Sequence, residues 1–252
     1  MKRPWIEKLK QLVRIPLYKA FHRGKQVFEC PICGYRGPFK DKYEKGNPPR
    51  HHRDSKCVGC GAVERHRMQY LVFNEVLTKW NAAGKKVLHI APELCLKPCL
   101  SGHFGQYDTA DLLRKDVNFT NEDVQHLSFA DGTYDCVCIS RVLVYPSNVD
   151  KAISELRRIL KPGGIAFIAE AYRAEKETPA RRASRARVLG LDTLDLCRNH
   201  FARVDCLISN RYDAKYQLFS RIEIDGKLDE DAPDMLRQPG VGIMDLVAVC
   251  HA

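Results

Sequence analysis

From residue 85 onward, short hydrophobic runs alternate with amphipathic segments, and this alternation constrains the fold more than any other feature of the chain. The hydrophobic runs predict strands at about 86–91, 107–111, 134–140, 165–169 and 244–249. Helical spacing predicts a helix at 148–160, and Pro92 suits the first position of another helix. This order indicates an α/β chain with a mostly parallel sheet covered on both faces. Ligands of such sheets bind beyond the carboxyl ends of the strands.

The first part of the chain contains two Cys-x-x-Cys-Gly sequences separated by 23 residues. Two such turns each present a pair of thiolates, which is typical of a tetrahedral zinc site. The predicted ligands are Cys30, Cys33, Cys57 and Cys60. Four thiolates leave no open coordination position, so we expect a structural Zn²⁺ rather than a catalytic one.

Two amphipathic helices are expected on either side of this cysteine region. In the first, Trp5, Ile6, Leu9, Leu12 and Val13 have helical spacing, and Pro16 is expected to end or kink the helix. Its apolar stripe is expected to pack on its own domain, although a basic amphipathic helix can also lie peripherally on a membrane. These patterns divide the chain into a basic amphipathic helix (1–25), a zinc ribbon (26–63), a connecting helix (64–84) and an α/β domain (85–252) that contains a basic insertion (173–190) and a polar loop (225–240).

The net charge of +10 is concentrated near the N-terminus. Residues 1–67 contain 17 Lys/Arg and 6 Asp/Glu, whereas residues 68–252 contain 24 and 25. A solvated basic face would explain this, and an anionic partner such as RNA, DNA or acidic lipid is the alternative.

Cysteine usage and hydropathy indicate in which cellular compartment the chain is expected. The chain has 11 cysteines, two of them (Cys136 and Cys138) in an expected core strand, which suits a reducing environment. No apolar run reaches the length of a membrane span, and the N-terminus has no apolar signal core. A cytoplasmic protein without a transmembrane segment is therefore expected.

Two motifs in the second domain carry a family resemblance. ELRRILKPGG at 155–164 and DVQHLSFADGTYDCV at 123–137, in this order after VLHIAPE at 87–93, resemble the class I S-adenosylmethionine-dependent methyltransferases, especially the type 11 group. The resemblance covers about 85–209. It implies a Rossmann-like, doubly wound fold with a mostly parallel seven-stranded sheet, and S-adenosyl-L-methionine as the cofactor.

The resemblance also implies site residues. Asp111, with Leu112 beside it, corresponds to the residue that accepts hydrogen bonds from ribose hydroxyls. Asp123 and Val124 match the segment that holds adenine, and Ser140 and Arg141 follow the strand where methyl donor and acceptor meet. The cofactor turn comprises His89, Ala91, Pro92 and Glu93.

The chain departs from the family pattern at two places. The cofactor turn lacks the usual glycines, so Glu93 is expected to meet the ammonium group of the cofactor or to serve only as a helix-start residue. Leu143-Val144-Tyr145 stands where many members have Leu-Glu-His. Tyr145 is the candidate to replace that histidine, and Glu170 and Tyr172, just past the strand at 165–169, are the other candidate catalytic residues.

The substrate is expected to be anionic. The segment 173–187 has six Lys/Arg against two Glu and is either a solvated loop or a lid over the acceptor. The expected substrate-binding residues are Arg65, Arg67, Arg181, Arg182 and Arg185. RNA is the leading acceptor class; a small molecule or a glycan-pathway sugar is the same-fold alternative, and a non-catalytic nucleic-acid-binding protein on a degenerate fold is the alternative of another class.

Overall fold

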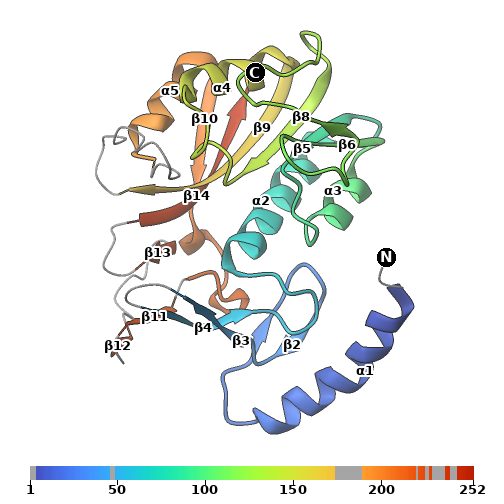
Figure 1. Ribbon diagram of the computed structural model, residues 1–252, viewed down its shortest axis with the longest axis vertical. Coiled ribbons are helices and arrows are strands. Elements are labelled where there is room, and N and C mark those ends of the chain that lie inside the picture. Colours follow the sequence, from blue (N-terminus) through green and yellow to red (C-terminus); the bar gives the residue numbers. More distant parts are fainter. Residues whose placement is uncertain are drawn as a thin grey trace.

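The computed structural model describes residues 4–45, 49–173, 189–219, 221–224, 227–228, 236–238 and 243–252. Two parts are visible, a large sheet with helices and a smaller module that carries the N-terminal helix α1 (Figure 1). Among the described residues, no helix is both long enough and apolar enough to cross a membrane. The predicted arginines Arg181, Arg182 and Arg185 lie outside the described residues.

The large sheet has the predicted Rossmann-like arrangement. Its path runs β7 (Phe119–Thr120), β6 (Gln106–Asp111), β5 (Lys86–Ile90), β8 (Tyr134–Ser140), β9 (Leu160–Arg173), β14 (Ile243–His251) and β10 (Arg203–Leu207), with β13 (Leu236–Gln238) paired to β14. The strands from β7 to β9 are parallel, and β14 is antiparallel to both β9 and β10. Seven strands on this path, mostly parallel, confirm the predicted fold.

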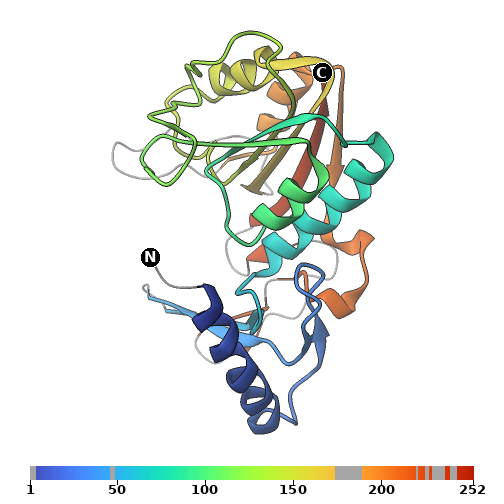
Figure 2. The same cartoon turned by 90° about the vertical axis from the view of Figure 1, so that its right-hand side faces the viewer.

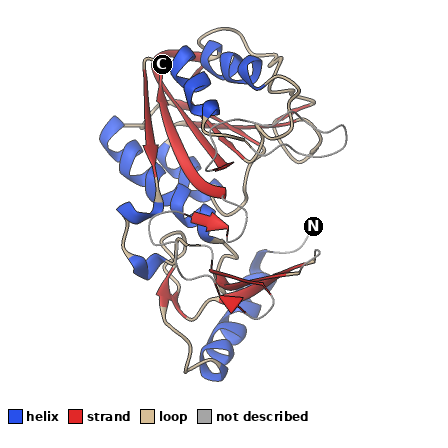
Figure 3. Ribbon diagram, turned by 90° about the vertical axis from the view of Figure 1, so that its left-hand side faces the viewer, coloured by secondary structure: helices blue, strands red, loops and turns tan. Residues whose placement is uncertain are grey.

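Helices cover both faces of the sheet (Figure 3). The helices are α2 (Glu64–Trp80), α3 (Lys97–His103), α4 (Val149–Arg158) and α5 (Asp192–His200). Successive residues of a strand point to opposite faces, so Val137 and Ile139 of β8 join a core with α4 and α5. Cys136 and Cys138 join the other core, with α2 and α3. Strands buried on both faces explain the nearly continuous apolar runs in the sequence.

The helix after the first strand starts later than the sequence predicts. The chain turns at Ala91, which has a left-handed backbone with φ of 51°. Pro92 is therefore outside the helix, and α3 begins at Lys97 with Pro98 in its first turn. The prediction of a helix starting at Pro92 was wrong because this proline ends the turn, while Pro98 has the helix-start position.

The smaller module contains β1 (Phe28–Glu29) and β2 (Arg36–Gly37), and a second sheet in the order β12, β11, β4, β3. In this sheet β3 (Lys40–Glu44) and β4 (Arg50–Lys56) come from the N-terminal region, whereas β11 (Arg221–Ile224) and β12 (Lys227–Leu228) come from near the C-terminus. Arg221 pairs with Arg53 and Glu223 with His51. The segment 225–240, predicted to be a loop, thus contains β12 and β13, because neighbouring strands supply backbone partners that its polar sequence does not reveal.

The N-terminal helix α1 (Pro4–Phe21) differs from its prediction in two respects. It does not end at Pro16. Leu12 and Val13, expected to pack on the domain, are 72% and 63% exposed. The face that packs on the module instead carries Ile15 and Tyr18, so Leu12 and Val13 point away from the core.

Candidate functional site

The four predicted metal ligands come together in the small module. All four sulfurs lie within 4.8 Å of one another, and Sγ of Cys30 is 3.6 Å from Sγ of Cys60. Sulfurs at about 2.3 Å from a tetrahedral zinc ion are separated by roughly 3.8 Å, so the cluster has the dimensions of a metal centre. The two turns have the same backbone geometry: Gly34 N donates to Cys30 O and Gly61 N to Cys57 O, at 2.9 and 3.0 Å. Both glycines have positive φ, 69° and 77°, which explains the residue type.

Arg67 lies beneath this cluster and is fully buried. Its Nη1 donates to the carbonyls of Ser55 and Ala62, both at 2.9 Å, and its Nε donates to Tyr216 O at 2.8 Å. Its Nη2 donates to Gln217 O. The prediction that Arg67 binds substrate was wrong, since its side chain is fully buried and donates its hydrogen bonds to backbone carbonyls of the protein.

A pocket of about 670 Å³ opens at the carboxyl edge of the large sheet. This size is within the usual range for small-molecule sites. Six of the ten residues predicted to bind a cofactor line it: Ala91, Asp111, Leu112, Asp123, Val124 and Arg141. Apolar walls also come from Val142 and Pro146, so the pocket combines carboxylates with an apolar slot.

The two aspartates of the pocket are held by local hydrogen bonds. Oδ1 of Asp111 accepts from the backbone N–H groups of Leu113 and Arg114, at 2.8 and 2.9 Å. Its Oδ2 has no hydrogen-bond partner within the described ranges, and so remains able to accept from a ligand. Asp123 accepts from Gln125 N at 2.9 Å, and Gln125 Oε1 accepts from Asn148 N. Gln125 therefore joins two walls of the pocket.

The other four predicted cofactor residues do not line the pocket. His89 is 1% exposed, with its Nδ1 2.9 Å from the hydroxyl of Tyr107. Pro92 is buried, and its carbonyl accepts from Arg114 Nη1 at 2.7 Å. Glu93 and Ser140 contact each other, at 3.3 Å between Ser140 Oγ and Glu93 Oε1. The structure thus brings these residues near the site without exposing them on its wall.

Glu93 is part of a polar cluster that α2 closes. His66 Nε2 lies 3.1 Å from Glu93 Oε1, and Arg65 Nε lies 3.5 Å from the same oxygen. Burial raises the pKa of the Glu93 carboxyl, but His66 and Arg65 outweigh it and hold the pKa below its ordinary value. Glu93 is therefore ionised and already paired, rather than a plain helix-start residue.

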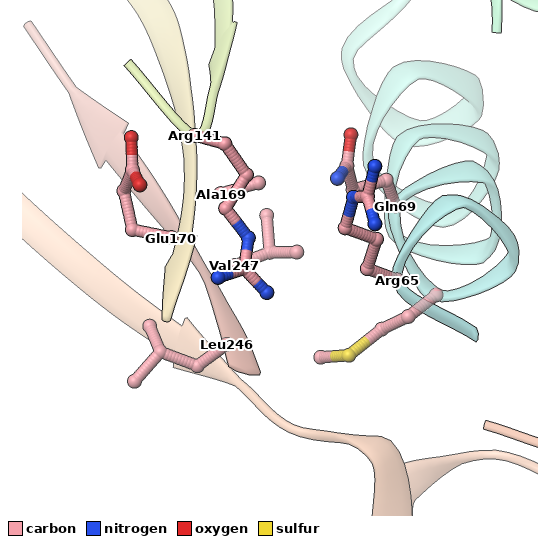
Figure 4. A pocket seen from close by; sticks show the side chains of 8 residues that line it. Arg65, Gln69, Arg141, Ala169, Glu170, Leu246 and Val247 are labelled. Atoms are coloured by element: carbon pink, nitrogen blue, oxygen red, sulfur yellow. The ribbon is translucent and has the colours of Figure 1, made fainter. Parts of the chain in front are cut away.

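A narrow gap separates the first turns of α2 from the sheet edge. Figure 4 shows Arg65 and Gln69 reaching from α2 toward Arg141, with Glu170 on the opposite side of β9. Gln69 Nε2 donates to Ser140 Oγ at 3.0 Å. Sequence reasoning missed Gln69, although a polar residue in line with Val72 and Phe73 of an amphipathic helix was an available signal.

The three candidate catalytic residues have different surroundings. Glu170 is 1% exposed, and its Oε1 accepts from the N–H groups of Val142 and Leu143, at 2.7 and 2.9 Å. Tyr172 is fully buried in the core, and burial raises the pKa of its hydroxyl well above the ordinary value. Tyr145 lines the pocket and is 59% exposed. Glu170 therefore holds the loop after β8 in place. Of the three candidates, Tyr145 is the one that lines the pocket.

Comparisons with known proteins match part of the chain to methyltransferases. Residues 99–168 match the family described as a methyltransferase domain. The chain is 43% identical over 54 residues to a ubiquinone/menaquinone biosynthesis C-methyltransferase of Haemophilus ducreyi, covering 21% of each chain. It is 46% identical over 57 residues to a demethylmenaquinone methyltransferase of Thermobifida fusca, covering 23% of this chain and 24% of that protein. The chain thus spans less than a quarter of the length of these relatives.

Solved structures are similar at low identity. An S-adenosylmethionine-dependent methyltransferase from Mesorhizobium loti gives a TM-score of 0.48 at 15% identity, over 71% of this chain and 97% of that one. The CurJ carbon methyltransferase gives 0.49 at 16% identity, over 78% and 56%.

Proposed function

We propose that the chain is an S-adenosylmethionine-dependent methyltransferase that acts on a small-molecule acceptor. The observation that carries the proposal is the pocket at the carboxyl edge of the sheet. Its residues Asp111, Asp123, Arg141 and Tyr145 all lie inside the segment that matches the methyltransferase domain.

The residues of the pocket fit the nucleoside half of this cofactor. Asp111 has an oxygen able to accept from ribose hydroxyls, because backbone N–H groups hold its other oxygen. Leu112, Val124 and Val142 offer apolar surface for an adenine ring, and Asp123 lies beside them as an acceptor for an amino group. When bound, the cofactor supplies a methyl group on a sulfonium, which needs little further activation.

The chain contributes position and exclusion of water rather than a strong base. Glu170 and Gln125 fix the two loops that border the pocket, and Ser140 is held between Gln69 and Glu93. Tyr145 is the candidate that can touch an acceptor in the pocket. Holding the acceptor in line with the methyl group accounts for much of the rate in such reactions.

Ion pairing in the small module favours a small acceptor over RNA. Arg53 lies 2.6 Å from Glu223, and Arg221 lies 2.9 Å from Asp54. Lys25 pairs with Asp41 at 2.8 Å, and Arg67 is buried. Three basic side chains of the region that suggested an RNA surface, Lys25, Arg53 and Arg67, are thus engaged within the protein. The relatives named above, which act in quinone biosynthesis by their names, also support a small acceptor.

We also propose a structural Zn²⁺ at the four cysteines. The sulfur spacing and the matching backbone of the two turns support it. The proposed division of the chain is the one expected from the sequence, with 221–224 and 227–228 added to the small module because β11 pairs with β4 and with β12.

Calorimetric titration of the zinc-loaded protein with S-adenosylmethionine tests the proposal. We expect micromolar binding that Asp111→Ala weakens by about 10- to 100-fold, since charge-assisted hydrogen bonds to the ribose are lost. Asp195→Ala, an exposed aspartate on α5, is the matched control and should bind as the parent does.

Absence of binding by folded, zinc-loaded protein would overturn the proposal. It would favour the alternative of a non-catalytic nucleic-acid-binding protein on a degenerate fold. If the cofactor binds but methyl transfer requires RNA and falls steeply with salt, the small-molecule part is wrong.

A further inference from the structure

The N-terminal helix α1 is fixed to the small module by one face. Tyr18 donates its hydroxyl proton to Phe39 O at 3.0 Å, and Arg14 Nη2 donates to Val58 O at 2.9 Å. Ile15 and Tyr18 pack against the small core that also holds Cys30. These contacts determine which face of the helix is left outward.

The outward face of α1 is apolar. Leu12, Val13, Leu17 and Phe21 are 72%, 63%, 51% and 82% exposed. Pro16 and Ala20, also exposed, fill the positions between them. A soluble helix normally buries such a stripe. Here α1 lies at the edge of the molecule (Figure 2), and these four side chains are exposed.

Basic side chains accompany this apolar face. Arg14, Lys19 and Arg23 are exposed, and residues 12–27 contain no Asp or Glu. Residues 1–27 contain eight Lys/Arg and one Glu, a net charge of +7. Helical spacing puts Arg14 and Lys19 at opposite borders of the apolar arc.

We propose that α1 docks the protein onto a membrane surface that carries anionic lipids. The helix lies in the interface, with Leu17 and Phe21 among the acyl chains and the exposed Lys19 and Arg23 at the level of the headgroups. This combination of an apolar face and basic borders is the one that interfacial helices use. The inference goes beyond the proposed function and does not depend on it.

Other occupants fit the observations less well. A nucleic acid would pair with the basic groups but would leave the apolar face in water. A second copy of the chain would oppose two helices of the same charge, which costs free energy on close approach. An anionic lipid surface satisfies both the apolar and the basic groups.

Cosedimentation of the full, zinc-loaded chain with lipid vesicles tests the proposal. We expect strong recovery with an equal mixture of phosphatidylcholine and phosphatidylglycerol, weakened by added salt, and little recovery with phosphatidylcholine alone. Leu17→Ser combined with Phe21→Ser should lower the affinity by a factor on the order of 100. Lys19→Gln combined with Arg23→Gln should lower it by about tenfold.

Leu94→Ser, at an exposed leucine of the α/β domain, is the matched control and should leave recovery unchanged. Recovery with neither vesicle overturns the proposal, as does recovery that neither double variant reduces. A dimer seen by light scattering that Phe21→Ser dissociates, without vesicle binding, would identify the face as a contact between two copies and contradict the proposal. Because the basic variant changes only exposed side chains, it tests the idea even if the apolar variant fails to fold.

Discussion

His89 stands in β5, and its side chain is 1% exposed. Burial lowers the pKa of its imidazole to about 4, with the Arg114 charge adding to the effect of burial. The sequence predicted a cofactor contact at this position. The structure gives His89 instead a hydrogen-bond partner in Tyr107, at 2.9 Å.

This burial makes stability depend on pH. Between about pH 6.5 and pH 4 the unfolded chain binds a proton at His89 that the folded chain does not, so stability falls as the pH decreases. We expect a loss of about 2 kcal/mol from this residue between pH 7 and pH 5. In His89→Gln, the free energy of unfolding measured with urea should fall by about 2 kcal/mol less between pH 7 and pH 5 than it does in the parent. His126→Gln, at an exposed histidine, should show the same pH dependence as the parent. Parallel pH dependence in the parent and His89→Gln would contradict this assignment.

Ala91 and Arg141 show what sequence could and could not reveal at this scale. The sequence located the cofactor turn at Ala91 and the strand end at Arg141 from neighbouring motifs. It could not reveal that both residues have positive φ, 51° and 56°, since that conformation costs an L-residue about 1–2 kcal/mol and local propensity argues against it. The backbone shape that glycine usually supplies is kept here without glycine, at a cost in strain.

Among the elements, α2 contributes most to the arrangement of the site. Its bounds, Glu64–Trp80, fall within the connecting helix expected at 64–84, because long periodic segments are the clearest signal in a sequence. The roles of its polar residues were not evident. Arg67 was expected on the surface, yet it satisfies carbonyls from three segments.

Replacing Arg67 should therefore affect folding rather than substrate affinity. Arg67→Met leaves buried carbonyls without donors, and we expect a loss of about 3 kcal/mol or more in the free energy of unfolding. Arg67→Lys should lose nearly as much, since an ammonium cannot reproduce the fork of the guanidinium. Lys79→Met, at an exposed position of the same helix, should change stability little. Urea unfolding checks this; equal stability of Arg67→Met and the parent would refute the structural role.

At the scale of the whole molecule, the small module is built from both ends of the chain. The alternation of strands and helices predicted the large sheet, because each of its parallel pairs is joined by a nearby helix or loop. The pairing of β11 with β4 could not be predicted, since a four-residue strand carries no information about a partner about 170 positions away. Arg53 and Glu223 illustrate the point: each looks like a surface charge until the fold pairs them.

Removal of the metal should therefore affect segments that lie far from the cysteines in the sequence. We expect that chelation of the proposed zinc raises amide hydrogen exchange in 28–60 and also in 221–224, while β8 and β9 remain protected. Hydrogen exchange measured by mass spectrometry before and after chelation checks this. Unchanged exchange in 221–224 would show that this strand is held independently of the metal.

The origin of β11 also bears on how the protein is made. At ordinary rates of synthesis, on the order of 10–30 s pass between the emergence of Arg53 and that of Glu223. During that interval β4 has β3 on one side and an open edge on the other, so the nascent chain displays a strand ready to pair with a neighbour. The order of translation thus makes the small module depend on a strand that is synthesised about 170 residues after β4.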